Sequence, residues 1–297
     1  MAGLSVAGVS IAQIASTGFR IVRERPKLVI AWSAVQLVLA LTQVLVMISL
    51  SGPAATRLMA TLVAQPPNLA KATQDLEAML PTLAILFPLS LVCGAFFSAA
   101  FNRAVLAPED DRFGYFRFGR AELHQFSVNL QLAMLFFVGS LILAVFGNLI
   151  ETLTHIPLQG PLLLAQAGGA IYVYARLSLA APQTFATGRI NLLGSWHLTR
   201  GRVGPILAAY GLSAVLGALV FFLAMLMTSA IVELAMGARS VVNVAPPDLR
   251  SAQAYFTFET SVRLALTSVI VALALPIWAT PPTVIYQLMT AEARPTR

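Results

Sequence analysis

The chain has 297 residues, of which 58% are hydrophobic and only 10% are charged. Soluble domains average about 25% charged residues, so this composition excludes a water-soluble fold. The formal net charge is +7, and the basic residues that produce it are concentrated beside the apolar runs. This distribution argues against nucleic acid as a partner and favours contact with a membrane surface.

The first 26 residues predict an amphipathic helix that lies in the cytoplasmic membrane interface, ahead of a membrane domain formed by residues 27–297. Pro26 ends this helix. One face of the helix is polar and the other is apolar. The polar face carries Ser10, Gln13, Thr17, Arg20 and Glu24, and the apolar face carries Ile11, Ile14, Ala15, Gly18 and Val22.

Six uncharged stretches are long enough to cross a bilayer, which takes about 20 predominantly apolar residues in a helix. A transmembrane barrel would alternate apolar and polar residues over about 10 positions, whereas these stretches are continuous. The sequence therefore predicts an all-α polytopic membrane protein. We expect the spans at 28–50, 81–106, 124–150, 162–181, 203–234 and 259–291, the last one bent near its end by Pro276, Pro281 and Pro282.

Two connecting segments have a pattern of their own. Pro66 and Pro67 divide the segment 51–80 into two short helical pieces, and the second piece is expected to pack on the bundle through Leu69, Ala72, Leu76 and Met79. The segment after the second span has four aromatic residues between arginines, which is typical of a membrane interface. These residues are Phe113, Tyr115, Phe116 and Phe118.

The basic residues predict the orientation of the chain. With both termini and the links after the second and fourth spans on one side, 14 of the 19 Lys and Arg residues lie there, while the acidic residues divide equally. Positive residues mark the cytoplasmic side, so both termini are expected to be cytoplasmic in a bacterial inner membrane. The five basic residues opposite are Arg57, Lys71, Arg239, Arg250 and Arg263.

The segment 176–202 is basic and has no acidic residue. On a helix, Arg189, Leu193, Trp196 and Arg200 would form one row suited to a membrane interface. The candidates for contact with lipid or a partner protein are Arg176, Arg189, Trp196, Arg200 and Arg202.

A possible interfacial repeat precedes the three outward-going spans. Its three copies are Phe19-Arg20-x-x-Arg23, Phe116-Arg117-x-x-Arg120 and Trp196-His197-x-x-Arg200. Each copy would begin a unit of an interfacial segment and a helical hairpin. The alternative is coincidence among arginines that the cytoplasmic side already favours.

Within the same segment, Arg176-Leu-Ser-Leu-Ala-Ala-Pro182, Gly188-Arg189 and Ser195-Trp196-His197-Leu198-Thr199-Arg200-Gly201 follow one another. This pattern resembles the membrane domain of bacterial glycerophosphoryl diester phosphodiesterases and related uncharacterised six-helix proteins. Their last helix ends in a Pro-rich stretch with Tyr-x-x-Leu, matched here by Pro276, Pro281 and Tyr286-Gln-Leu-Met289, with Leu288 one place early. The catalytic barrel of those enzymes has no counterpart, so the resemblance implies a six-helix topology and carries no enzymatic activity.

The sequence contains no pattern of catalytic residues. His124, His155 and His197 are isolated, which predicts no metal site, and no motif indicates a cofactor. Glu259 and Arg263 are spaced to pair on one helix face. We therefore expect a non-enzymatic scaffold or accessory protein whose basic cytoplasmic face contacts anionic lipid or another membrane protein. The alternative is a small transporter or channel, which would require Gln36, Asn129 and Gln166 to converge on a cavity in the middle of the membrane.

Overall fold

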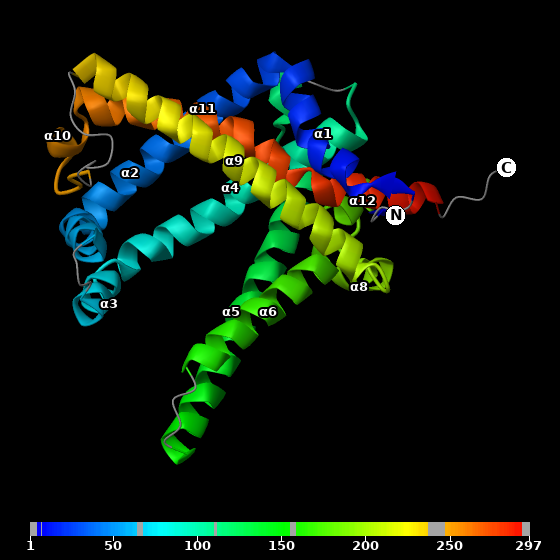
Figure 1. Ribbon diagram of the computed structural model, residues 1–297, viewed down its shortest axis with the longest axis horizontal. Coiled ribbons are helices and arrows are strands. Elements are labelled where there is room, and N and C mark those ends of the chain that lie inside the picture. The colour runs from blue at the N-terminus through cyan, green and yellow to red at the C-terminus, as the bar shows by residue number, and fades with distance from the viewer. Residues whose placement is uncertain are drawn as a thin grey trace. The chain divides into compact units, whose positions relative to one another are not determined.

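The computed structural model describes residues 5–6, 8–63, 68–109, 112–154, 159–236 and 247–292. Apart from one short hairpin, in which β1 (Ser5–Val6) pairs with β2 (Val9–Ser10), the regular elements of this part are helical (Figure 1). It contains six helical segments that are long and apolar enough to cross a membrane, which confirms the all-α fold with six spans.

The spans are built on the longer helices, which agree with the apolar runs to within a few residues at most ends. These helices are α2 (Pro26–Val63), α4 (Leu80–Leu106), α5 (Arg120–Thr154), α6 (Gln159–Leu177), α9 (Val203–Met236) and α11 (Phe258–Ala279). The shorter elements are α1 (Ile11–Glu24), α3 (Leu69–Glu77), the 3-10 helix η1 (Arg112–Tyr115), α7 (Ala180–Thr187), α8 (Leu192–Leu198), α10 (Ala252–Tyr255) and α12 (Pro281–Glu292).

The chain divides into two compact units, each made of several chain segments. Unit 1 consists of Met1–Ile21, Leu91–Ala214 and Ile277–Arg297, and unit 2 consists of Val22–Ser90 and Val215–Pro276. Unit 1 holds the basic segment 176–202 and the aromatic link before α5.

The core of unit 1 joins the two ends of the chain. Ile11 and Ile14 of α1 pack in one cluster with Leu179, with Ile206 of α9 and with Ile285 of α12. The predicted apolar face of α1 is thus confirmed at Ile11, Ile14, Ala15 and Gly18, which are buried, while Thr17 of the predicted polar face is buried as well. We expected the apolar face of α1 to contact the membrane interface. In the structure Ile11 and Ile14 of that face pack against apolar residues of α9 and α12 instead, which removes them from solvent.

In unit 2, helix α2 changes direction at Ser51, whose backbone leaves the helical region (φ −145°, ψ 22°). The buried Thr82 hydroxyl donates to Ser51 Oγ at 2.6 Å, and Ser51 Oγ donates to the carbonyl of Ala78 at 3.3 Å. These bonds fasten the break in α2 to the start of α4. Residues 52–63 therefore form a separate helical piece, which agrees with the first of the two short helical pieces predicted for 51–80; Pro66 and Pro67, which were expected to divide them, lie outside the described residues.

Helix α3 packs on this second piece of α2, as the helical spacing predicted. Met79 is buried and Ala72 is half-buried, but Leu76 is 47% exposed, so its predicted contact is wrong. Asp75 takes the inward position that we had given to apolar residues. Its carboxylate accepts a hydrogen bond from Arg57 Nε at 2.8 Å, with the Asp75 side chain only 6% exposed. A partner for its charge allows an acidic residue there.

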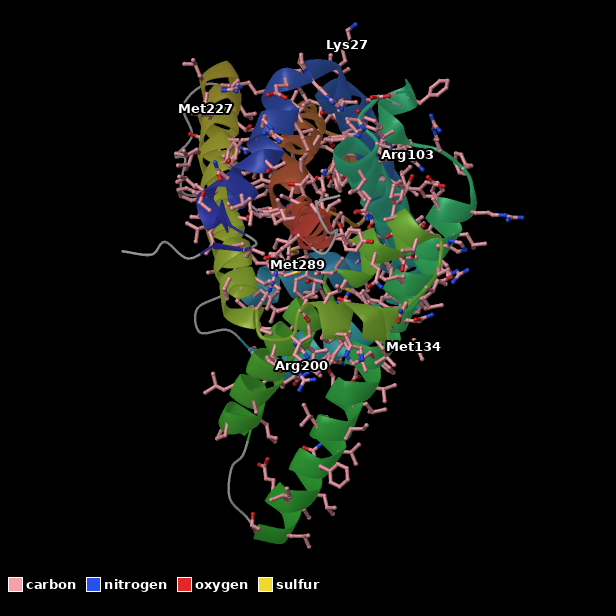
Figure 2. The ribbon with its side chains drawn as sticks, turned by 90° about the vertical axis from the view of Figure 1, so that its right-hand side faces the viewer. Lys27, Arg103, Met134, Arg200, Met227 and Met289 are labelled. Carbon is pink, nitrogen blue, oxygen red and sulfur yellow. The ribbon has the colours of Figure 1, made fainter. Side chains whose placement is uncertain are left out.

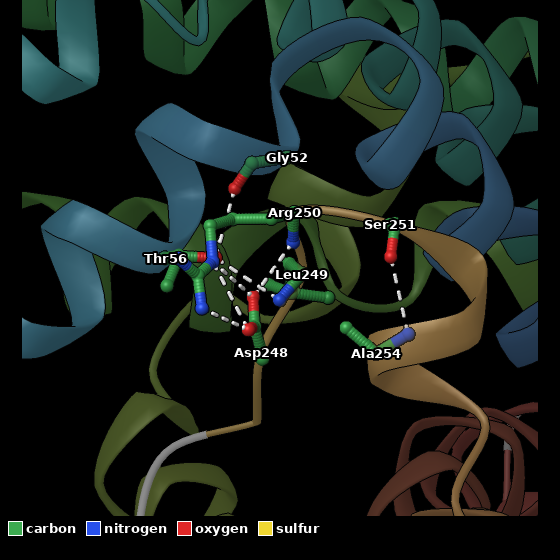
Figure 3. Close-up of polar contacts among 7 residues, drawn as sticks. All are labelled: Gly52, Thr56, Asp248, Leu249, Arg250, Ser251 and Ala254. Carbon is green, nitrogen blue, oxygen red and sulfur yellow. Dashed lines mark hydrogen bonds and ion pairs between the residues drawn. The ribbon is translucent and has the colours of Figure 1, made fainter.

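The link between α9 and α11 lies on the second piece of α2 (Figure 3). The amide of Leu249 donates to Thr56 Oγ1 at 3.0 Å, and a Cβ atom placed on Gly52 would lie 2.1 Å from the Leu249 carbonyl oxygen. Only glycine permits this approach of two backbones. Next to it, hydrogen bonds from Arg250 lower the pKa of Asp248 to about 2, so this half-buried carboxylate is ionised at neutral pH.

The last span is bent where the sequence predicted. Helix α11 ends at Ala279 and α12 begins at Pro281, because the two prolines cannot continue the helical hydrogen bonds of α11. The predicted pair on α11 is also confirmed: Arg263 Nε lies 3.0 Å from Glu259 Oε1. The same guanidinium reaches Ser229 of α9 at 3.3 Å.

Candidate functional site

Helix α7 holds several elements of unit 1 together through polar contacts. The buried amide of Gln125, on α5, donates to the carbonyl of Ala181 at 2.8 Å. The amide of Leu179 donates to Ser195 Oγ of α8 at 3.1 Å. The helical ends that surround the basic segment are therefore fixed to one another by hydrogen bonds as well as by apolar packing.

The sequence of this region explains why it folds as two short helices. Pro182 has no amide hydrogen for the carbonyl of Ser178, so one continuous helix through 159–187 would lose a hydrogen bond there. The chain breaks at 178–179, and Pro182 takes a place in the first turn of α7, where no amide hydrogen is needed. Gly188 has a left-handed backbone (φ +65°) and ends α7.

Arg176 is the most unusual of the predicted contact residues, because it is buried (6% exposed). Its guanidinium carbon lies 4.3 Å from the centre of the Trp196 ring, a cation–π contact. Its backbone carbonyl accepts hydrogen bonds from Ser195 Oγ at 2.8 Å and Thr199 Oγ1 at 3.2 Å. The structure thus brings together Arg176 and Trp196, two of the five residues that we proposed for this segment.

The predicted helical row is wrong. Arg189 follows the end of α7, and Arg200 lies in the turn after α8 (Figure 2), so only Leu193 and Trp196 share a helix. Asn191 begins α8 by accepting a hydrogen bond from the amide of Gly194 at 2.8 Å. The spacing misled us because it assumed one helix from Arg189 to Arg200, whereas Asn191 starts α8 two residues after Arg189 and Thr199 ends it before Arg200.

The remaining arginine of this segment, Arg202, pairs with the last helix. Its Nη1 lies 2.7 Å from Glu292 Oε2 of α12, and the two side chains are 42% and 50% exposed. Arg202 therefore belongs to an exposed ion pair in unit 1. Arg189 and Arg200 are also exposed, but they form no ion pair with a described residue.

The other members of the proposed repeat lie in different conformations. Phe19, Arg20 and Arg23 belong to helix α1. Phe116 and Arg117 lie in the non-helical link after η1, and Arg120 is the first residue of α5. The third copy is partly in α8. The three segments share a sequence pattern without a common backbone structure.

The aromatic link before α5 only partly matches the predicted interfacial belt. Phe113 and Phe118 are 89% and 93% exposed, as the belt requires. Tyr115 is fully buried, and its hydroxyl donates to the carbonyl of Pro108 at 2.8 Å. Phe116 packs its ring edge-on against Phe97 of α4 at 5.2 Å. Tyr115 and Phe116 thus anchor the link, while Phe113 and Phe118 are exposed, the Phe118 ring lying edge-on to Phe96 at 4.8 Å.

A buried ion pair in unit 1 was missed at the sequence level. Arg103, near the end of α4 (Figure 2), lies 2.7 Å from Glu122 in the first turn of α5, with side chains 8% and 6% exposed. The Arg103 guanidinium also donates to the carbonyl of Tyr115 and lies 5.4 Å from the centre of the Phe185 ring on α7. The sequence feature that could have predicted this pair is an arginine at the end of the second span and a glutamate at the start of the third, because these two ends face each other.

Two apolar cavities of unit 1 bear on the transporter alternative. One, of about 300 Å³, lies between α4 and α5, and the other, of about 240 Å³, lies between α5 and α6. Gln166 lines the second cavity and donates to Ser140 at 2.7 Å, whereas Asn129 lies beside Gly94 and lines neither. Gln36 belongs to unit 2. In unit 1, Asn129 and Gln166 therefore do not share either cavity.

Comparison with known proteins adds no assignment. No family model, no curated protein and no solved structure matches this chain. The resemblance to the phosphodiesterase membrane domain stays an expectation from the segment 176–201. Within the described ranges, no group of three or more His, Cys, Asp or Glu side chains is placed to hold a metal ion. What the structure shows is a multi-span helical membrane protein.

Proposed function

We propose that this protein is a non-enzymatic scaffold or accessory protein of a bacterial inner membrane, with a basic cytoplasmic face that contacts anionic lipid. Both termini lie in the cytoplasm in this proposal. The basic face is formed by arginines that precede or follow the spans on that side. Other membrane proteins are possible additional partners through the same face.

One observation carries the proposal. Arg20, Arg120, Arg189 and Arg200, all in unit 1, are exposed and form no ion pair with a described residue. The buried Arg103, by contrast, has its own carboxylate partner. Positive residues that are left unpaired at the ends of membrane spans attract the anionic phospholipids of the adjacent leaflet, each contributing about 1 kcal/mol near the surface.

The test is the lipid that co-purifies with the protein in mild detergent. The triple variant Arg120→Gln, Arg189→Gln, Arg200→Gln should lose about 3 kcal/mol of attraction, which reduces its enrichment of anionic phospholipid by at least tenfold. The matched control is Lys71→Gln with Arg250→Gln, which removes two exposed basic residues from unit 2 and should leave the lipid profile unchanged.

An unchanged lipid profile in the triple variant, at normal abundance, would overturn the proposal. The variant Trp196→Ala tests the contribution of the aromatic side chain, since it keeps every positive charge. If Trp196→Ala abolishes folding while the triple variant retains its lipids, the segment 176–202 has only an architectural role. A small molecule that co-purifies reproducibly in place of lipid would instead favour transport.

A further inference from the structure

Arg176 carries a positive charge into the interior of unit 1 without a negative partner. It is 6% exposed, and no carboxylate of the described residues forms an ion pair with it. Its buried Nε has no hydrogen-bond acceptor. Arg103, the other buried arginine of unit 1, has both a carboxylate and a carbonyl oxygen. Arg176 is thus a donor that the described part of the chain leaves incomplete.

The surroundings hold this guanidinium in one place. Ser195 and Thr199 are fully buried and both donate to the Arg176 carbonyl, which fastens α8 to the end of α6. This places the Trp196 ring 4.3 Å from the guanidinium carbon, and Tyr172 of α6 packs edge-on against that ring at 6.1 Å. A stacked guanidinium keeps its in-plane N–H donors for another ligand.

A buried charge without a counter-charge is unfavourable, and the Trp196 face offsets only part of that cost. A cation–π contact is weaker than the effective desolvation penalty of a buried ion. A planar guanidinium binds phosphate and carboxylate oxygens with two parallel hydrogen bonds. The missing partner is therefore expected to be an oxyanion.

The position of Arg176 along its span selects the kind of oxyanion. Arg176 is one residue from the end of α6, whose 19 residues cover roughly 28 Å at about 1.5 Å per residue. Since the apolar core of a bilayer is about 30 Å thick, a crossing made by α6 brings this guanidinium to the level of the headgroups, where phospholipid phosphates lie.

We propose that the Arg176 guanidinium, stacked on Trp196, binds a phosphate oxyanion, supplied by a phospholipid headgroup or as inorganic phosphate. This inference deepens the proposed function and rests on it for the lipid source. It assigns one saturable site, distinct from the general attraction of the exposed arginines. Arg176 supplies the charge and the hydrogen bonds, and Trp196 orients it.

The experiment measures thermal unfolding of the full chain after removal of co-purified lipid. Three additions are compared with a sample that receives none: phosphatidylglycerol, a galactosyl diacylglycerol with the same acyl chains and no phosphate, and inorganic phosphate. Phosphatidylglycerol at about 100 times its Kd should raise the Tm of the wild type by about 4 °C or more. The sugar lipid should not. Arg176→Gln should lose this rise, and Lys71→Gln, which removes an exposed charge from unit 2, should keep it.

Comparison of the added compounds shows whether the bound phosphate comes from a phospholipid headgroup or from inorganic phosphate. A rise with phosphatidylglycerol alone identifies the headgroup, and a rise with inorganic phosphate as well identifies the phosphate group by itself. A rise that persists in Arg176→Gln, or that the sugar lipid produces equally, overturns the inference. If Arg176→Gln does not fold, Arg176→Lys takes its place: it keeps the charge, loses the planar fork, and should bind about tenfold more weakly. Unchanged binding in Arg176→Lys also overturns it.

The two proposals fail independently. The general contact fails if the triple arginine variant keeps its lipid profile, whereas the Arg176 site fails if the phosphate-dependent rise in Tm survives its removal. The triple variant leaves Arg176 and Trp196 in place, so it should retain the rise.

Discussion

The buried ion pair between α4 and α5 gives a strong test of the fold of unit 1. Glu122→Gln removes the negative charge and leaves Arg103 buried, with Oε1 of Glu122 no longer available as an anion at 2.7 Å. Breaking a buried pair in this way costs about 3 to 5 kcal/mol, because the remaining charge has no partner. An exposed pair costs about 0 to 1 kcal/mol.

The measurement is reversible unfolding in mixed micelles, with Glu292→Gln as the matched control. Glu292 forms the exposed pair with Arg202 at the same distance of 2.7 Å, so the two variants differ mainly in burial. The double variant Arg103→Met, Glu122→Leu removes both charges and should be less destabilised than Glu122→Gln. If Glu122→Gln costs no more than Glu292→Gln, the pair is not buried from water and the reasoning is refuted.

Three further predictions concern unit 2 and the orientation of the chain. Gly52→Ala should destabilise the protein by about 1 to 3 kcal/mol, since the new methyl group would meet the Leu249 carbonyl at 2.1 Å; a variant as stable as the wild type in the same unfolding assay would refute this close approach. Arg263→Gln should cost only about 0.3 to 1 kcal/mol, because its partner Glu259 is 40% exposed, and a loss of transport at normal abundance would favour a gate instead. Reporter fusions test the orientation, and an inverted result at any site would contradict six spans with cytoplasmic termini. Fusions should report the outside after Met79 and Val244, and the inside after Asp111, Gly194 and Arg297.

Hydrophobic run length was sufficient to predict the spans, because a bilayer imposes the same length and composition on every crossing helix. It also predicted the end of the first span at residue 50, where Ser51 leaves the helical region, but not what holds that break in place. The break at Ser51 is held by Thr82 and Ala78, which lie about 30 residues further along the chain. Contacts at that separation leave no local pattern.

The sequence predicted which residues belong to the candidate site, but not which of them are in contact. Trp196 and Arg176 were both candidates, but the reason given for Trp196 was a helical row with Arg189, which fails because the helix that holds Trp196 begins only after Asn191. The partner of Trp196 is Arg176, twenty positions earlier, and their contact depends on the turn between α7 and α8. Glycine and asparagine at helix ends were visible in the sequence and should have outweighed the spacing of the arginines.

The core of unit 1 also bears on how the protein is assembled during synthesis. Val6, Ile11 and Ile14 are synthesised well before their partners Ile285 and Met289, which lie in the helix that follows the break of the sixth span at 279–281. Contacts between residues so far apart in sequence can form only after the intervening chain has been made. The buried Arg103–Glu122 pair, by contrast, joins residues 19 positions apart and can close as soon as two consecutive spans are inserted. Helix α1 must therefore remain without its final partners until the sixth span has been inserted, and a nascent chain that lacks α12 leaves this core open.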